Sequence, residues 1–193
     1  MKYDAGYDRY TDPETGVLFN RENIREARLL EIFASEQAAF RAPTLPDGNL
    51  DASHLQAIHF HLFQDVFDWA GEFRDCPLAI GETLFCQPQF IQNCLDSSLK
   101  DAHPATWGQL TRDQLAARLA HSLIELNAVH PFRDGNGRAI RAFIVNMAEK
   151  AGYALGFSHI ARDAWVEASI QGQNGDNTQM TELLKNGLEP LTE

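Results

Sequence analysis

One short stretch, HPFRDGNGRAIR at residues 130–141, brings together the residue types that can do chemistry. His130 supplies an imidazole, Asp134 supplies a carboxylate, and Arg138 and Arg141 follow with a three-residue spacing. A neutral imidazole can take a proton from an attacking hydroxyl, and guanidinium groups bind phosphate oxygens through paired N–H donors. The stretch therefore has the components of a site that transfers a group from a phosphate-containing ligand.

The glycines within the stretch indicate how such a ligand could be held. A helix that begins near Gly137 presents unpaired backbone N–H groups and the positive end of its dipole, and Gly135 and Gly137 allow a phosphate to approach the backbone closely. Arg138 and Arg141 then project from one side of the first turn, where they can hold successive phosphates. A carboxylate beside phosphates, here Asp134, suits Mg²⁺, which takes its other ligands from phosphate and water.

The stretch could instead have a purely structural role, as a corner between two helices in which Asp134 and Asn136 satisfy backbone donors. Two common phosphate-binding motifs do not fit it. The chain has no G-x-x-x-x-G-K-[ST] sequence, which excludes a P-loop. Residues 135–137 begin a G-x-G-x-x-G pattern, but Ile140 occupies the third glycine position and a helical segment precedes it, which excludes a Rossmann site.

Composition narrows the class of protein further. A length of 193 residues suits one domain, and 44% hydrophobic residues argue against global disorder. A formal net charge of −11 argues against direct nucleic-acid binding and against docking on anionic membranes. Three cysteines without metal-ligand spacing, and no signal-peptide core or membrane-spanning run, lead us to expect reduced thiols and a cytoplasmic location.

Hydrophobic periodicity predicts a mainly α fold, a compact bundle of about seven helices with a small β-hairpin flap. After an irregular lead-in at residues 1–20, helices are expected over residues 23–41, 54–70, 90–100, 111–127, from about 137 to 152, 161–169 and 178–185. The flap is expected within residues 73–90. In the first helix, the apolar face is predicted to contain Ile24, Leu29, Ile32, Phe33 and Phe40.

The other histidines and the tryptophans are expected to be structural. His59 and His61 are two residues apart and point in different directions on a helix, so surface or packing roles fit them better than a shared metal. Trp69, Trp107 and Trp165 are expected to pack in or against the core.

Residues 130–141 resemble the Fic family motif H-P-F-x-[D/E]-G-N-G-R-x-x-R and match it at every specified position. Residues 54–74, HLQAIHFHLFQDVFDWAGEFR, resemble the leading helix of the family and its Trp-Ala-Gly ending, and residues 80–85 resemble its flap. The resemblance covers about residues 50–190. It implies the Fic fold, with an N-terminal lead-in and helix at residues 1–49 and a core domain at residues 50–193 in one structural unit.

The resemblance also implies an activity, the transfer of AMP from ATP to a Ser, Thr or Tyr hydroxyl of a target protein. His130 would be the general base and Asp134 would hold Mg²⁺ across the α- and β-phosphates. The phosphates would be bound by the segment Gly135, Asn136, Gly137 and Arg138, and the γ-phosphate by Arg141. The flap, through Gly81 and Thr83, would hold the target segment as an added strand; an ordinary surface hairpin is the alternative.

The sequence also bears on regulation and on two competing functions. Fic enzymes are often inhibited by a helix bearing [S/T]-x-x-x-E-[G/N], but the match here, Thr178 to Glu182, is followed by Leu183. The chain therefore most resembles toxins inhibited by a separate small antitoxin that carries this motif. A Fic-fold phosphotransferase is one alternative, disfavoured by the intact G-N-G-R sequence. A catalytically silent nucleotide-binding module is the other, disfavoured by the intact His130.

Overall fold

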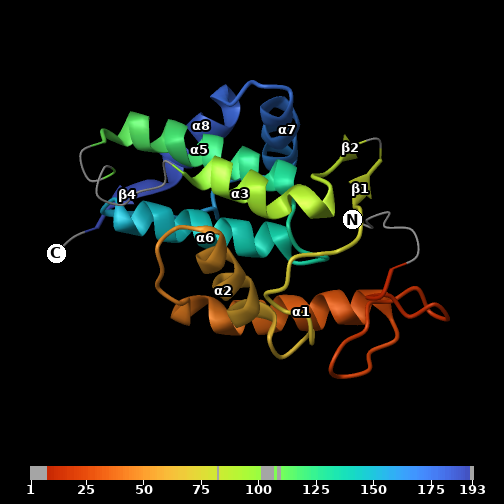
Figure 1. Cartoon of the computed structure of the whole chain (residues 1–193). Coiled ribbons are helices and arrows are strands. Elements are labelled where there is room, and N and C mark those ends of the chain that lie inside the picture. The colour runs from red at the N-terminus through yellow and green to blue at the C-terminus, as the bar shows by residue number, and fades with distance from the viewer. Residues whose placement is uncertain (1–7, 82, 101–106, 108–109, 192–193) are drawn as a thin grey trace.

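The computed structural model describes residues 8–81, 83–100, 107 and 110–191. In this part of the chain it has seven α-helices and two short two-stranded antiparallel sheets, which confirms the expected mainly helical fold (Figure 1). The helices are α1 (Ala27–Arg41), α2 (Ala52–Phe63), α3 (Ile91–Leu99), α5 (Arg112–Val129), α6 (Asn136–Lys150), α7 (Arg162–Gln173) and α8 (Thr178–Gly187). Two 3₁₀ turns, η1 (Ala42–Thr44) and η2 (Pro88–Phe90), accompany them. Strand β1 (Ala79–Ile80) pairs with β2 (Thr83–Leu84), and β3 (Tyr153–Leu155) pairs with β4 (Leu188–Pro190).

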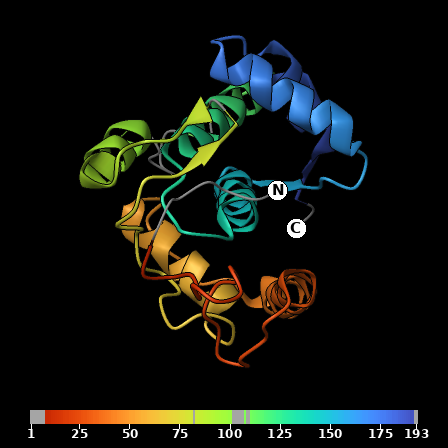
Figure 2. The ribbon, with the colours of Figure 1, turned by 90° about the vertical axis from the view of Figure 1, so that its right-hand side faces the viewer.

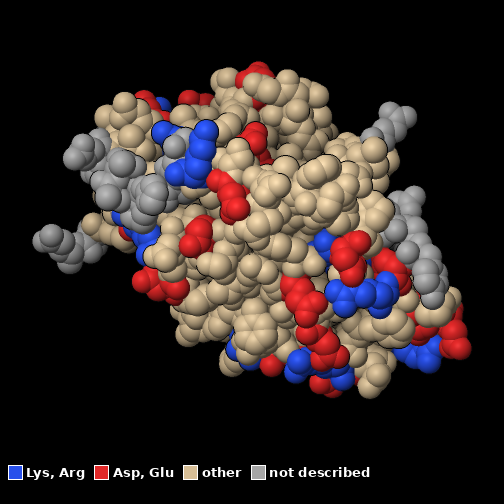
Figure 3. Space-filling view, in the orientation of Figure 1, with Lys and Arg blue, Asp and Glu red and all other residues tan. Residues whose placement is uncertain are grey.

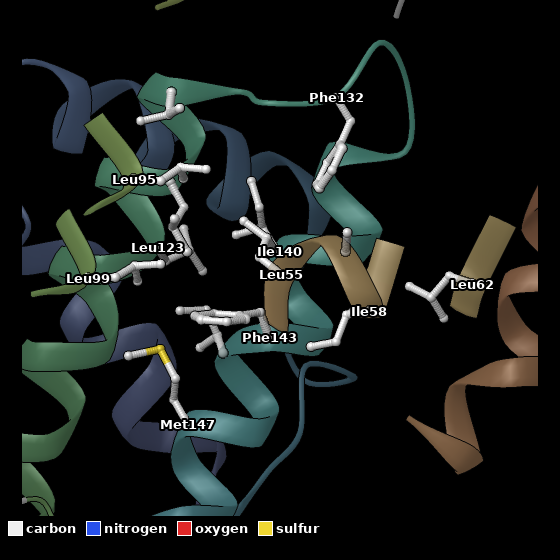
Figure 4. Close-up of a cluster of buried hydrophobic side chains, with 14 of the residues drawn as sticks. Leu55, Ile58, Leu62, Leu95, Leu99, Leu123, Phe132, Ile140, Phe143 and Met147 are labelled. Atoms are coloured by element: carbon white, nitrogen blue, oxygen red, sulfur yellow. The ribbon is translucent and has the colours of Figure 1, made fainter. Parts of the chain in front are cut away.

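Helix α6 is the central element of the fold. Figure 2 looks along it and shows α1 and α2 on one side and α3, α5, α7 and α8 on the other. Its buried side chains, which include Ile140, Phe143 and Met147, meet apolar side chains from three neighbouring helices: Leu55 and Ile58 of α2, Leu95 and Leu99 of α3, and Leu123 of α5 (Figure 4). Because α6 packs against both layers, its first turn has a fixed position relative to the surrounding helices.

Helix α1 begins at Ala27 instead of the expected residue 23 because Asn20 holds the preceding segment in a turn. The Asn20 side chain accepts a hydrogen bond from the N–H of Ile24 and donates one to its carbonyl, at 2.9 and 2.8 Å. Asn23 has a left-handed backbone with φ of 53°. A helix cannot continue through such a residue, so the helical hydrogen bonds start only after it.

The buried face of α1 also differs from the prediction. It consists of Leu30, Ala34 and Ala38, spaced four residues apart. Leu29, Ile32 and Phe40 were assigned to the buried face, and they are 51%, 45% and 80% exposed. Small alanines let α1 lie close against α2, which the count of large apolar residues along the helix could not indicate.

Helix α2 ends at Phe63, seven residues earlier than expected. The chain leaves the helix through tight turns, in which the N–H of Val66 bonds to the carbonyl of Phe63 and that of Ala70 to the carbonyl of Phe67. These turns place Trp69 in stacked contact with Phe67, with ring centroids 4.2 Å apart. The expected packing role of Trp69 is thus observed at the end of a turn region and not on a helix.

The two-stranded β3–β4 sheet was not anticipated from the sequence. Gly152, with φ of 85°, ends α6 and turns the chain into β3, and its carbonyl accepts a hydrogen bond from the N–H of Leu191 at 2.9 Å. The pairing partner lies far along the chain, in β4, so no local pattern revealed it. This strand pairing fastens the segment after α8 to the end of α6.

The N-terminal lead-in is irregular, as expected, but its Asp8 side chain is buried in an ion pair with Arg133. Arg133 donates from Nε to Asp8 Oδ2 at 2.8 Å, and the Asp8 side chain is fully buried. The other Asp8 oxygen accepts the N–H of Tyr10 at 2.8 Å. Arg133 also donates to the Thr11 hydroxyl at 3.2 Å. A buried ion pair therefore ties the first described residues to the loop that precedes α6.

Asp8→Ala is expected to lower the free energy of unfolding by about 3–5 kcal/mol, because it leaves the Arg133 charge buried without its partner. Denaturant titration measures the effect. The control is Asp68→Ala, which removes an exposed ion pair with Arg21 at 3.0 Å and should have a much smaller effect. Equal losses for the two variants would show that the Asp8 pair does not stabilise the fold as described.

The surface of the fold carries mixed charge. On the face shown in Figure 3, Lys and Arg side chains lie beside Asp and Glu side chains and form no continuous basic stripe. Within the described residues, none of the helices combines the length and apolar character needed to cross a membrane.

Candidate active site

The site is built on the loop that joins α5 to α6. Helix α5 ends at Val129, and His130 adopts a left-handed conformation with φ of 50° while its N–H still bonds to the carbonyl of Leu126 at 3.0 Å. This conformation is uncommon for a residue with a side chain, and it turns the chain sharply away from the helix. The imidazole is 7% exposed and stacks on Phe85, with ring centroids 3.9 Å apart and planes at 13°.

The surroundings of His130 keep its imidazole neutral. Burial lowers the pKa of His130 to about 4, and the nearby charge of Arg74 acts in the same direction, while the carbonyl of Asn127 opposes them. That carbonyl lies 3.2 Å from Nδ1. Because a carbonyl can only accept a hydrogen bond, Nδ1 carries the proton and Nε2 carries the basic lone pair. At neutral pH the residue is thus in the form that a general base requires.

Asn136 fixes the loop after His130 through its side chain. Its Oδ1 accepts the N–H of Phe132 at 2.8 Å, and its Nδ2 donates to the carbonyl of Phe132 at 2.7 Å. The side chain is fully buried. Since both ends of the amide hold the loop, any contact of Asn136 with an anion would come from its backbone N–H.

Gly135 turns the loop into α6. It has φ of 76° and is the residue immediately before the helix. A Cβ atom at this position would lie 2.5 Å from Cε2 of Phe63 and 3.2 Å from Nε2 of His59, so there is room only for glycine. By helix geometry the N–H groups of Asn136 and Gly137 lack an acceptor within the helix, whereas the N–H of Arg138 lies 3.1 Å from the carbonyl of Gly135.

His59 of α2 supports this loop, a role that the sequence did not reveal. Its Nδ1 accepts the N–H of Gly71 at 2.9 Å, so its Nε2 carries the proton and donates to the carbonyl of Asp134 at 3.0 Å. The ring is fully buried and stacks on Phe132, with centroids 3.8 Å apart. Burial lowers the pKa of His59 to about 3, so it is a neutral bridge between the segment after α2 and the loop.

Asp134 and Arg138 lie together at the start of α6. Asp134 Oδ2 is 3.6 Å from Arg138 Nη2. Burial raises the pKa of Asp134, and the charge of Arg138 opposes that shift. Helix α1 holds the other side of Arg138, whose guanidinium contacts the Ser35 hydroxyl at 3.2 Å and Glu31 Oε2 at 3.5 Å. A largely buried carboxylate with a single cation at this distance can accept a further cation.

Arg141 lies one turn along the same helix. Its guanidinium is 5.7 Å from the ring centroid of Trp165 and lies beside Gly137, 3.4 Å from where a Cβ atom would be. Burial, and then the charge of Arg138, lower the pKa of Arg141. Among the described residues no carboxylate forms an ion pair with Arg141. Two neighbouring guanidinium groups and the start of a helix thus create a position that favours an anion.

The expected flap is a short hairpin. β1 and β2 pair antiparallel, with Ile80 opposite Thr83, and Gly81 forms the turn with φ of 59°. Thr83 is exposed. The hairpin meets the loop through its base, where Phe85 stacks on His130 and the N–H of Cys86 bonds to the carbonyl of Ala128 at 3.2 Å. The structure therefore brings the base of the hairpin, and not Gly81 or Thr83 themselves, against His130.

Fold and site together define a mainly helical protein with a neutral histidine at the end of one helix and two neighbouring arginines at the start of the next. The model of the Fic/DOC family matches residues 49–148, and the chain belongs to that family. It is 37% identical over 182 residues to the "Probable protein adenylyltransferase Fic" of Escherichia coli strain K12, covering 93% of this chain and 91% of the relative.

Two solved structures share the fold. One is the N-terminal Fic domain of a VirB-translocated Bep effector protein from Bartonella quintana with bound ADP, with a TM-score of 0.85, 28% identity, and 95% of each chain covered. The other is the BepC protein of Bartonella tribocorum with bound AMPPNP, with a TM-score of 0.84, 26% identity, and 95% of this chain and 97% of that chain covered. Both relatives thus hold an adenine nucleotide.

Proposed function

We propose that this protein is an adenylyltransferase that moves AMP from ATP to a Ser, Thr or Tyr hydroxyl of a target protein. The observation that carries the proposal is a neutral, buried His130 next to a helix start that gathers Arg138 and Arg141. The adenylyltransferase name of the Escherichia coli relative and the nucleotides bound by the two Bartonella proteins support it.

In the proposed mechanism His130 Nε2 takes the proton of the target hydroxyl. The hydroxyl oxygen forms a bond to the α-phosphorus of ATP, the bond from that phosphorus to the oxygen bridging to the β-phosphate breaks, and pyrophosphate leaves. The N–H groups of Asn136 and Gly137 and the guanidinium of Arg138 hold the phosphates, and Arg141 holds the γ-phosphate. The protein thus contributes position and charge neutralisation, which are the main demands of such transfers.

Asp134 is proposed to hold Mg²⁺. The residues fit this ion, because Mg²⁺ in nucleotide sites uses one or two carboxylates together with phosphate oxygens and water, and the Asp134 side chain is a single carboxylate 22% exposed at the start of α6. Bound Mg²⁺ would neutralise phosphate charge as the α- to β-phosphate link breaks. The carboxylate would position the ion relative to Arg138.

Radiolabelled ATP tests the proposed activity. The purified chain is incubated with cell lysate, Mg²⁺ and ATP labelled at the α- or the γ-phosphate. Label from the α-position on protein supports AMP transfer. Label from the γ-position alone would instead identify a phosphotransferase. If neither position labels protein, the chain would be a catalytically silent nucleotide-binding module.

The hairpin is proposed to bind the target segment as an added strand, with Gly81 and Thr83 at the binding edge. β1 and β2 form a two-stranded sheet among the described residues, so each is an edge strand, and Thr83 and Leu84 of β2 are exposed. The base of the hairpin packs on His130. A strand added there would bring its hydroxyl near the proposed base.

We also propose that a separate small protein carrying [S/T]-x-x-x-E-[G/N] controls the activity. Arg141 has no carboxylate partner among the described residues, which leaves its guanidinium available for a glutamate supplied by another chain. Glu182, the near match within this chain, lies on α8, where Leu183 packs against the core. If Glu182→Gln strongly increased the activity of the purified protein, control would reside in this chain and the antitoxin proposal would be wrong.

The pH dependence of transfer follows from the lowered pKa of His130. A base with a pKa of about 4 stays neutral as the pH falls from 7.5 to 5.5, so the maximal rate should change little, within about twofold. An unshifted histidine, with a pKa of about 6.5, would lose roughly 90% of its neutral form by pH 5.5. Initial rates at saturating ATP across this range distinguish the two outcomes.

A further inference from the structure

Arg74 is a buried arginine that binds main-chain carbonyls. The residue is 2% exposed. Its Nε donates to the carbonyl of His130 at 2.8 Å and its Nη2 to that of Val129 at 3.2 Å. Its Nη1 donates to the carbonyl of Cys76 at 2.8 Å, and its Nη2 also donates to that of Cys86. Among the described residues no carboxylate forms an ion pair with it, so carbonyl dipoles compensate its charge.

These four carbonyls belong to two parts of the site. Val129 and His130 are the last turn of α5, where the negative end of the helix dipole attracts a cation. Cys76 lies three residues before β1 and Cys86 two residues after β2, so they flank the β1–β2 hairpin. The backbone N–H of Arg74 adds a bond to the carbonyl of Pro131 at 2.9 Å. One side chain therefore fastens both ends of the hairpin to the end of the helix that carries His130.

We propose that Arg74 is a positioning residue that fixes the flap relative to His130, so that a hydroxyl carried by a segment on the flap meets the imidazole. The proposal rests on the proposed function. Two further contacts depend on how the hairpin is placed against the end of α5. They are the stacking of Phe85 on His130 and the hydrogen bond from the N–H of Cys86 to the carbonyl of Ala128. Arg74 touches none of the reacting groups.

The geometry requires an arginine and not only a positive charge. The planar guanidinium offers five N–H donors in fixed directions. Here Nε donates to the end of α5, Nη1 to the carbonyl of Cys76 and Nη2 to that of Cys86. An ammonium group has three donors on one atom and cannot reach both the end of α5 and both ends of the hairpin. Arg74→Lys therefore keeps the charge and removes the bridge.

The first experiment compares Arg74→Lys with Arg41→Lys. Arg41 pairs with Asp65 at the end of α1, outside the site, and its Nε donates at 2.6 Å. For Arg74→Lys we expect the maximal rate of α-label transfer to lysate protein to fall about 10- to 100-fold. The KM for ATP and the affinity for AMPPNP should stay within about twofold, because the phosphate-binding residues are untouched. Arg41→Lys should change neither. An unchanged maximal rate in folded Arg74→Lys, or a loss explained by weaker ATP binding, would overturn the proposal.

The second experiment uses the unaltered protein, so it does not depend on whether a variant folds or transfers label. Amide hydrogen exchange should show equal protection, within about tenfold, for the N–H groups of Cys86 and His130, because the hairpin base and the end of α5 open together. Exchange of Cys86 several orders of magnitude faster than His130 would mean that Arg74 does not join the two parts. If the wild type transfers no label, the proposed function fails, while this exchange result still decides the structural link.

Discussion

Replacement of His130 by alanine is expected to lower the rate of AMP transfer by about 10²–10⁴-fold, the usual contribution of a general base. The affinity for ATP and Mg²⁺ should stay close to that of the wild type, because Asp134, Arg138 and Arg141 keep their positions at the start of α6. Labelling with α-labelled ATP measures the transfer, and calorimetric titration with AMPPNP measures the binding.

His121→Ala is the matched control for this experiment. His121 lies on the same helix, α5, with an exposed side chain, so its removal should leave the transfer rate unchanged. If His130→Ala instead transfers AMP at nearly the wild-type rate, the imidazole is not the base. If it loses ATP binding to the same extent as transfer, His130 serves the structure of the loop and not the proton transfer.

Gly135→Ala is expected to have the largest effect on the loop itself. The left-handed conformation at φ of 76° costs an alanine about 1–2 kcal/mol. Its methyl group would also lie 2.5 Å from Cε2 of the buried Phe63, and such overpacking typically costs about 1–3 kcal/mol. We expect the free energy of unfolding to fall by about 2–5 kcal/mol and ATP binding to weaken, because the turn that orients the first N–H groups of α6 must shift.

Gly152→Ala separates the cost of the left-handed backbone from the cost of the steric contact. Gly152 also has a positive φ, 85°, but a Cβ atom there has nothing within 4 Å. This variant should lose only the conformational part, about 1–2 kcal/mol, and should bind AMPPNP normally. Denaturant unfolding of both variants gives the comparison. Equal destabilisation of the two would show that the contact with Phe63 relaxes without cost and that Gly135 is needed only for its backbone angle.

The residues proposed for chemistry were predictable because they are contiguous in sequence. His130, Asp134, Arg138 and Arg141 fall within one turn-and-helix segment, so local spacing alone indicates that they lie together. The helices with clear apolar periodicity were predictable for a related reason. In α5 and α6 the large apolar side chains do lie on buried faces.

The residues that support the site were not predictable, because each acts over a long separation in sequence. His59 reaches Asp134, Arg74 reaches the end of α5, and Asp8 reaches Arg133, each through one or two hydrogen bonds. The available signals were weak: a histidine within an apolar stripe, and an arginine between Phe73 and Asp75 shortly after Trp69. Of the apolar face predicted for the first helix, Ile24 and Phe33 do pack against the core, whereas Leu29, Ile32 and Phe40 are exposed. The physical reason is that small residues pack more closely than large ones and leave the latter exposed.

The ion pair between Asp8 and Arg133 has a consequence for moving this loop between proteins. Arg133 occupies the position that the family motif leaves unspecified, and it is the residue through which the loop is attached to the lead-in of this chain. A graft of residues 130–141 into a homologue would carry every motif residue but would bring an arginine without its carboxylate. The recipient would then have to supply its own acidic anchor, or the transplanted segment would lose its shape.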